Sequence, residues 1–273
     1  QVDIATSDSD FRRRKPSMAE YHAIVLDPWT WADREGWRLK TQLKGREGDI
    51  FIMDFFGSEV PHKNLGVPAQ RFLTAFPTPP EREHTFLGYR MDNSQIPAQK
   101  VKKKQQGVIW GKTKRSFEDA ATWNLIDRLA EIAEVHSSVA SRDIRSMRVH
   151  DNVVFHGVLS EEEWSRLLQE SKFMIGLGHP LSGPSAVDAV ASGCVYINPV
   201  YSVPKKTFYT SQHPYLRQAV GEPYVCSYTE KATLKCARKA LEQELEPMLP
   251  NELTNDAHKT RVRDIFVPIF NKR

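Results

Sequence analysis

Gly183, Pro184, Ser185 and Asp188 form the strongest candidate binding site in the sequence. The first three begin a short predicted helix, and the N–H groups of a first helical turn have no partners within the helix. Asp188 follows about one turn later and is expected to share their face. Such N–H groups bind phosphate well, and a carboxylate beside them accepts hydrogen bonds from a sugar diol. A second interpretation stays open, in which Asp188 only stabilises the first turn electrostatically.

Two further side chains follow predicted strands. Lys112 comes soon after the apolar run Gly107–Trp110, where its charge can reach a phosphate; an ordinary surface lysine is the alternative. The Gly111-Lys112-Thr113 sequence is not a P-loop, because Gly107 is one residue too close and an apolar strand fills the space between the two glycines. His156 stands at another strand end, where it can approach a nucleotide base or a diphosphate; a purely structural histidine is the alternative.

Other kinds of chemistry lack the motifs they need. The sequence has no HExxH or GxSxG motif, so metalloprotease and serine-hydrolase activities are not indicated. Cys194, Cys226 and Cys236 have no CxxC spacing, which argues against a zinc site. Cys194 lies in an apolar run and is expected to be a buried thiol. Cys226 and Cys236 can pair in an oxidising compartment, and the sequence leaves that pairing open.

The composition is that of a globular, mildly basic protein. The 273 residues are 40% hydrophobic and carry a formal net charge of +4, which is compatible with an anionic ligand. No apolar run reaches the roughly 18–20 residues of a membrane span. The chain begins at Gln1, so its localisation cannot be read from a leader sequence. Asp8-Ser9-Asp10 has polar and basic flanks and favours a solvated tail over a metal-binding pair.

The elements around the candidate site form a strand–loop–helix–strand unit. A buried strand is expected over Phe173–Leu177, a loop over Gly178–Gly183, a helix from Pro184 to Gly193 and a second strand over Cys194–Ile197. Proline is favoured at the first helical position and glycine just after the last one, so both helix boundaries are marked. The loop then lies at the carboxyl end of a strand, where open α/β sheets bind ligands.

The same alternation continues on both sides and predicts an α/β protein with a doubly wound, mostly parallel sheet in residues 107–273. Residues 91–106 are polar, contain the basic run Lys100–Lys104 and are predicted to be a solvated linker. Residues 21–90 hold shorter apolar runs and are predicted to be part of another domain, and residues 1–20 are a polar tail. RNA binding through the basic runs is a less favoured alternative.

The order of the motifs resembles a known family. The stretch FHGVLSEEEWSRLLQESKFMIGLGHPLSGPSAVDAVASGCVYINP resembles the donor-binding half of GT-B glycosyltransferases. More closely, it resembles glycosyltransferase family 18, the α-1,6-mannosylglycoprotein 6-β-N-acetylglucosaminyltransferases. MDFFGSE, GVIWGK, EVHSSV, TSQHPY and EPMLP occur in the family's order, so the similarity covers roughly residues 20–270.

The resemblance implies a GT-B fold with two Rossmann-like domains, of which this chain holds the C-terminal, UDP-sugar-binding one and the end of the N-terminal, acceptor-side one. It implies an inverting N-acetylglucosaminyltransferase that moves GlcNAc from UDP-GlcNAc to the 6-hydroxyl of an α-linked mannose of N-glycans on glycoproteins. No metal, other cofactor or nucleic acid is implied. Family members are type II membrane proteins with a lumenal catalytic region in the Golgi; the membrane segment and the catalytic base are expected outside this chain. A noncatalytic nucleotide-sugar- or glycan-binding relative is the alternative.

The resemblance also implies roles for the candidate residues. Gly157, Val158 and Leu159 correspond to a uracil-contacting segment. The loop from Gly178 to Ser185, with Ser182, Gly183 and Pro184, corresponds to the loop that contacts the diphosphate and the sugar. Asp188 stands where the family has a ribose-binding glutamate and is one methylene shorter, and Ser182 replaces a second carboxylate. The loop between Asn198 and Ser211 is shortened, so no residue in it is matched to the family's acceptor-contacting lysine.

Overall fold

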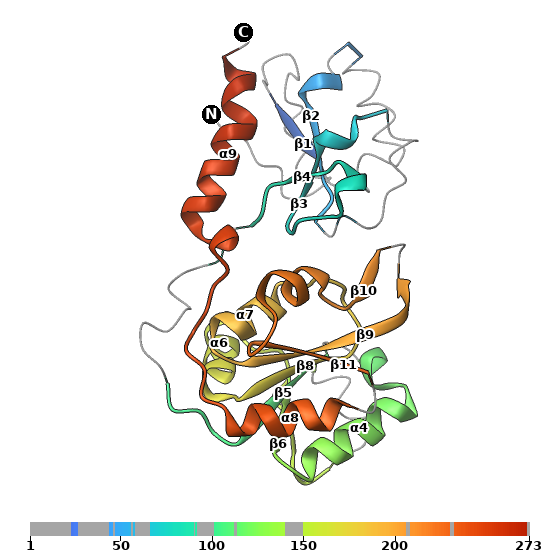
Figure 1. Ribbon diagram of the computed structural model, residues 1–273, viewed down its shortest axis with the longest axis vertical. Helices are drawn as coiled ribbons and strands as arrows, with labels where there is room; N and C mark the ends of the chain where they lie inside the picture. The colour runs from blue at the N-terminus through green and yellow to red at the C-terminus, as the bar shows by residue number, and fades with distance from the viewer. Residues whose placement is uncertain are drawn as a thin grey trace. The chain divides into compact units, whose positions relative to one another are not determined.

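The chain folds into two compact units, which Figure 1 shows with their helices and strands labelled. The first contains residues 1–87 and 259–273, and the second contains residues 88–258. The structure, a computed structural model, describes residues 23–26, 44–45, 47–55, 57, 66–89, 91, 101–111, 114–139, 150–205, 208–229 and 232–271. The predicted N-terminal tail lies outside the described residues, as does most of the predicted linker.

The second unit is built on a seven-stranded sheet in which β11 pairs with β9 and the other strands follow the order β10-β9-β8-β5-β6-β7. Every pairing is parallel except that of β9 with β10. The strands are β5 (Gln106–Trp110), β6 (Glu134–Ser137), β7 (Val153–Phe155), β8 (Phe173–Gly176), β9 (Val195–Lys205), β10 (Tyr209–Ser211) and β11 (Val225–Tyr228). The α/β fold class predicted from the sequence is confirmed.

Helices cover both faces of this sheet. Figure 1 shows α6 and α7 on one face and α4 and α8 on the other. Their bounds are α4 (Ala120–Ala130), α6 (Glu161–Glu170), α7 (Ser185–Ala191) and α8 (Thr233–Glu242). Short 3-10 turns span Lys114–Phe117 and Asn251–Leu253, and a π-helical turn spans Leu216–Val220. On the α4 and α8 face, isoleucines from three neighbouring strands (Ile109, Ile175, Ile197) pack in one fully buried core with Leu129 and Ala237.

Local sequence signals explain where the helices of the α6 and α7 face begin and end. Ser160 and Glu163 form a capping box at the start of α6: the Glu163 N–H donates to Ser160 Oγ at 3.2 Å, and the Ser160 N–H donates to Glu163 Oε2 at 2.8 Å. Helix α7 begins after Pro184 and is followed by Gly193, whose φ of +72° is the left-handed conformation that glycine adopts without strain.

The first unit has a four-stranded parallel sheet in the order β1-β2-β3-β4. Its strands are β1 (Ile24–Leu26), β2 (Ile50–Met53), β3 (Phe72–Thr74) and β4 (Thr85–Phe86). Short 3-10 turns span Glu47–Asp49, Ala69–Arg71 and Pro80–Arg82. Parallel pairing throughout agrees with the Rossmann-like domain that the family resemblance implies.

The division of the chain differs from the predicted one at the C-terminal helix α9 (Asn255–Phe270), whose residues from Lys259 onward group with the first unit. The reason is visible in its contacts. The Phe266 ring lies 5.0 Å from the Phe51 ring, and the Arg261 guanidinium lies 4.2 Å from the centre of the Phe86 ring. Arg261 Nε also donates to the Leu87 carbonyl at 2.9 Å. The periodicity of a sequence does not show which domain a terminal helix packs on.

The described end of the predicted linker is also not a solvated segment throughout. Gln106 already belongs to β5, and Lys103 is only 7% exposed. The interactions of Lys103 hold together the helices that support the candidate site.

A disulfide links β11 to α8 through Cys226 and Cys236, which the sequence had left as an open possibility. Cys194 is a free, buried thiol, as predicted. None of the helices that the structure describes is both long and apolar enough to cross a bilayer.

Candidate functional site at the carboxyl edge of the second sheet

The candidate site occupies the carboxyl edge of the second unit's sheet, where its loops meet at a reversal of strand order. From β5 the chain moves outward to β6 and β7 and then returns to β8 on the opposite side of β5. Ligands of open α/β sheets bind at such a switch point. The loops after β7 and β8 contain most of the predicted site residues. Lys112 lies outside the described residues.

Buried Gln212 holds the loop after β8 in shape. Its Oε1 accepts from the Gly178 N–H at 2.8 Å, its Nε2 donates to the Pro180 carbonyl at 2.9 Å, and its own carbonyl accepts from the Ser182 N–H at 2.8 Å. Gly178 and Ser182 both have positive φ, +85° and +44°. The loop is therefore braced by a residue about 30 positions away, and the N–H groups of Gly178 and Ser182 are already engaged.

The start of α7 packs tightly against the central strand β5. A Cβ placed on Gly183 would lie 2.4 Å from Cη2 of Trp110, whose side chain is buried, so only glycine fits here. The N–H groups of Ala186 and Val187 bond to the carbonyls of Gly183 and Pro184. Within the described part of the chain, the N–H groups of Gly183 and Ser185 have no such partner, which leaves them available to an anionic ligand.

Asp188 is half-buried on the α6 side of α7, where it borders a small cavity with Trp164, Leu168 and Met91. The pKa of Tyr89 is raised mainly by burial and further by the negative charge of Asp188. Asp188 therefore has an electrostatic neighbour, Tyr89, that was not predicted from the sequence.

The loop after β7 begins with an exposed histidine that stacks on a buried one. The rings of His156 and His136 are nearly parallel, with centroids 5.1 Å apart, and Nε2 of His156 lies 2.8 Å from Nδ1 of His136. Gly157 is buried with a φ of +77°, whereas the Val158 side chain is 81% exposed. Leu159 is half-buried. This places an exposed apolar side chain and an imidazole next to each other at the edge of the sheet.

Two residues from the β9–β10 hairpin reach the β8 loop and were missed from the sequence. The Tyr201 hydroxyl donates to the Gly178 carbonyl at 3.1 Å, and the Lys205 ammonium lies 4.0 Å from the centre of the Tyr201 ring. A Cβ on Gly178 would lie 3.6 Å from Lys205 Nζ. Partial burial lowers the pKa of Lys205. Both residues belong to β9, because pairing with β10 extends that strand to Lys205.

The hairpin also borders a cavity of about 360 Å³ on the α4 side of the same edge. It is lined by residues of four neighbouring segments, among them Asp119 and Arg128 of the α4 region, Gly178, Lys205 and Tyr228. Gly178 is thus both hydrogen-bonded to Gln212 and part of the lining of this cavity.

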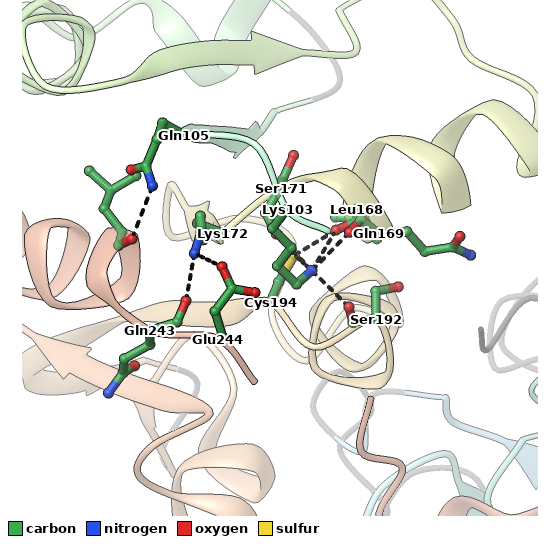
Figure 2. A network of polar contacts seen from close by, with 11 residues as sticks. Lys103, Gln105, Leu168, Gln169, Ser171, Lys172, Ser192, Cys194, Gln243 and Glu244 are labelled. Atoms are coloured by element: carbon green, nitrogen blue, oxygen red, sulfur yellow. Dashed lines mark hydrogen bonds and ion pairs between the residues drawn. The ribbon is translucent and has the colours of Figure 1, made fainter. Parts of the chain in front are cut away.

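Behind the site, buried Lys103 joins the ends of α6 and α7, as Figure 2 shows. Its ammonium donates to the carbonyls of Gln169, Ser171 and Ser192 at 3.0, 2.9 and 2.9 Å and reaches the Leu168 carbonyl at 3.3 Å. Carbonyls at helix C-termini carry partial negative charge and have no partner within the helix. The lysine therefore fixes the ends of the two helices whose beginnings adjoin the candidate site.

Cys194 belongs to the same cluster. Its sulfur lies 2.9 Å from the Leu168 carbonyl and 3.0 Å from the Ser171 carbonyl, which share its single S–H, and 3.8 Å from Lys103 Nζ. Burial raises the pKa of Cys194 to about 11, against the opposing effect of the nearby ammonium. Burial also lowers the pKa of Lys103. In Figure 2, Lys172 makes a second contact of this kind, to the Gln243 carbonyl and the Glu244 carboxylate.

A family model and several characterised relatives match this chain. The model of glycosyltransferase family 18 matches residues 53–267. Alpha-1,6-mannosylglycoprotein 6-beta-N-acetylglucosaminyltransferase A of Cricetulus griseus is 30% identical over 227 residues, covering 76% of this chain and 30% of the relative. Alpha-1,6-mannosylglycoprotein 6-beta-N-acetylglucosaminyltransferase of Caenorhabditis elegans is 29% identical over 218 residues, which cover 73% of this chain and 32% of the relative. The chain thus spans about a third of the length of these relatives.

Solved structures agree with the fold. UDP-GlcNAc 2-epimerase from Methanocaldococcus jannaschii, in complex with UDP-GlcNAc and UDP, aligns with a TM-score of 0.54 at 10% identity, over 95% of this chain and 78% of that one. MnaA of S. aureus, in complex with UDP, aligns with a TM-score of 0.52 at 10% identity, over 96% and 76%. At this identity the likeness concerns the fold alone.

Proposed function

The chain belongs to glycosyltransferase family 18, and on that premise we propose that its second unit binds the UDP-GlcNAc donor of an N-acetylglucosaminyltransferase. The acceptor in this proposal is the 6-hydroxyl of an α-linked mannose in an N-glycan, so the reaction creates a β1,6 branch. We further propose that the transfer inverts the anomeric centre and uses no metal ion. The observation that carries the proposal is that the family match spans both loops at the carboxyl edge of the second sheet.

In this proposal, different site residues bind the uracil base and the diphosphate of the donor. The segment Gly157–Leu159 would lie against the uracil ring, where exposed Val158 offers an apolar surface. The Gly183 and Ser185 N–H groups would meet the diphosphate, since they have no partner in the described part of the chain. Two other loop N–H groups are engaged by Gln212 and are not counted as donors to the ligand.

The chemistry requires that negative charge on the departing diphosphate be stabilised as the acceptor oxygen attacks C1. A general base must remove the acceptor proton while an oxocarbenium-like centre forms. Fixed N–H donors and a cation in a partly dehydrated site stabilise the leaving group. We assign the cation to Lys205, which lies beside Gly178, and we assign the base to no residue of this chain.

Replacing Asp188 with alanine tests the ribose contact. If the carboxylate accepts from the ribose diol, UDP affinity falls by a factor equivalent to about 1–3 kcal/mol. The wild type should then bind 2′-deoxy-UDP more weakly than UDP, and Asp188→Ala should bind both equally by calorimetry. A lower melting temperature with unchanged UDP affinity would instead support the purely electrostatic role in the helix.

Replacing Lys205 with glutamine should lower UDP affinity by about tenfold to a hundredfold and leave uridine affinity unchanged. The reason is that a hydrogen bond to a charged group contributes about 1.5–3 kcal/mol, and only the diphosphate would receive it. Calorimetry with both ligands checks this, and Lys235→Gln, an exposed lysine of α8, serves as the matched control. Equal losses for uridine and UDP would rule out a contact with the diphosphate.

An assay of product formation distinguishes a transferase from a noncatalytic binding relative. A full-length protein that binds UDP-GlcNAc but forms no product with a biantennary glycan acceptor would be a binding relative.

We also propose that the protein acts in the lumen of the Golgi as a type II membrane protein. The Cys226–Cys236 disulfide supports an oxidising compartment, since such bonds persist mainly there.

A further inference from the structure

A carboxylate and two imidazoles form a continuous contact along one face of the sheet and end at the proposed base-binding segment. Glu134 and His136 are alternate residues of β6, so they share a face, and the pairing of β6 with β7 brings His156 onto it too. His136 Nε2 lies 2.8 Å from Glu134 Oε1, although their relative orientation falls short of a well-directed hydrogen bond. His136 Nδ1 lies 2.8 Å from His156 Nε2.

The surroundings of His136 indicate where the protons lie. The Glu134 carboxylate, 2.8 Å from Nε2, favours an N–H over a lone pair at that nitrogen, even though the contact is not a well-directed hydrogen bond. Between the two imidazoles, two lone pairs would repel at 2.8 Å, so that contact contains one proton. Burial lowers the pKa of His136, and a neutral imidazole has only one N–H, so its Nδ1 accepts. His156 Nε2 therefore donates.

This order of protons leaves the other ring nitrogen of His156, Nδ1, without a hydrogen. Since its single N–H is at Nε2, its Nδ1 carries a bare lone pair. Within the described part of the chain no donor reaches Nδ1, and the His156 side chain is exposed. Glu134 thus sets the tautomer of an exposed histidine through the buried one, as a partner on one ring nitrogen generally does for the other.

We propose that His156 Nδ1 accepts the N3–H of a uracil ring and thereby selects uracil over cytosine. The proposal rests on the proposed donor site, because it needs a pyrimidine nucleotide at Gly157–Leu159. Uracil carries a hydrogen on N3 between two carbonyls, whereas N3 of cytosine is a bare acceptor. Against cytosine, two lone pairs would face each other and the polar groups would be left unpaired. Sites built on a hydrogen bond reject such analogues strongly.

The test compares UDP and CDP binding to the intact chain by calorimetry at about pH 7.5. The wild type should prefer UDP by at least about tenfold. His156→Phe keeps the ring but has no nitrogen and should reduce the ratio to about threefold or less. His156→Asn places an amide oxygen near the position of Nδ1 and should restore most of the preference.

Glu134→Gln checks the relay itself. Its amide can donate to His136 Nε2 and so permits the reversed proton order, which should narrow the UDP/CDP ratio at pH 7.5 without altering the β7 loop. A wild type that binds both nucleotides equally, or a His156→Phe variant that keeps the full ratio, would overturn the inference alone. A folded wild type that binds neither nucleotide would overturn the proposed donor site as well.

Discussion

Replacing Lys103 with methionine lowers the apparent melting temperature by about 6–12 °C, a large loss of stability for a single substitution. The side chains have similar length, so the change removes mainly the ammonium. Gln169 and Ser192 carbonyls then lose the donor that the structure shows for them. A buried polar group left unsatisfied costs about 1–3 kcal/mol, and about 3 kcal/mol in total corresponds to the stated shift for a unit of this size.

The neighbouring lysine provides the matched control. Lys104 makes an ion pair with Glu170 at 2.5 Å but its side chain is 63% exposed, so Lys104→Met should cost less than about 1 kcal/mol. Melting of both variants followed by circular dichroism checks the difference. At temperatures where Lys103→Met is still folded, its UDP affinity should also be lower than that of the wild type, because the ends of α6 and α7 are no longer held together. Equal melting temperatures for the two variants would contradict the role of the ammonium.

Replacing Gly183 with alanine lowers UDP affinity about tenfold or more. The new Cβ would lie 2.4 Å from Trp110, whose ring is 1% exposed and therefore enclosed by the core. The start of α7 must therefore shift. Overpacking of this kind costs about 1–3 kcal/mol, and the same shift displaces the Gly183 and Ser185 N–H groups from the diphosphate. Calorimetry with UDP, together with thermal melting, measures both effects.

A second substitution identifies the clash as the cause. Trp110→Phe removes the part of the ring nearest Gly183 and breaks no hydrogen bond, since the indole N–H has no partner among the described residues. Combined with Gly183→Ala it should recover part of the UDP affinity, which a double-mutant cycle would show as favourable coupling. Gly48→Ala is the control, because a Cβ there meets nothing within 4 Å. Additive effects of the two substitutions would show that the clash is not responsible.

Elements with local chemical boundaries could be predicted from the sequence. Proline and glycine bracket α7, and Ser160 and Glu163 cap α6, because these signals act over one helical turn. The order of strands and helices was enough for the fold class. The assignments of the individual site residues remain predictions, although most of them lie on loops at one edge of the sheet.

The remaining features depend on partners far along the chain. A run of lysines is usually solvated, and nothing local distinguishes Lys103, whose carbonyl partners lie 65–89 residues away. Gln212 supports a loop more than 30 residues before it, and Lys205 reaches that loop only because β10 extends β9. Contacts of this kind are determined by tertiary packing, and hydrophobic periodicity carries no information about which distant residues meet.

The disulfide between β11 and α8 has a consequence for how the protein matures. The three cysteines of this chain allow three pairings with one another, and only one of these pairings leaves Cys194 reduced beside Lys103. Cys226 and Cys236 are separated by 10 residues, and Cys194 is much farther from either, so the entropy of loop closure favours the native pair even in the unfolded chain. Once folded, Cys194 is inaccessible and its high pKa keeps it as an unreactive thiol. Sequence spacing and burial thus both favour the Cys226–Cys236 pair over the two other pairings of these three cysteines.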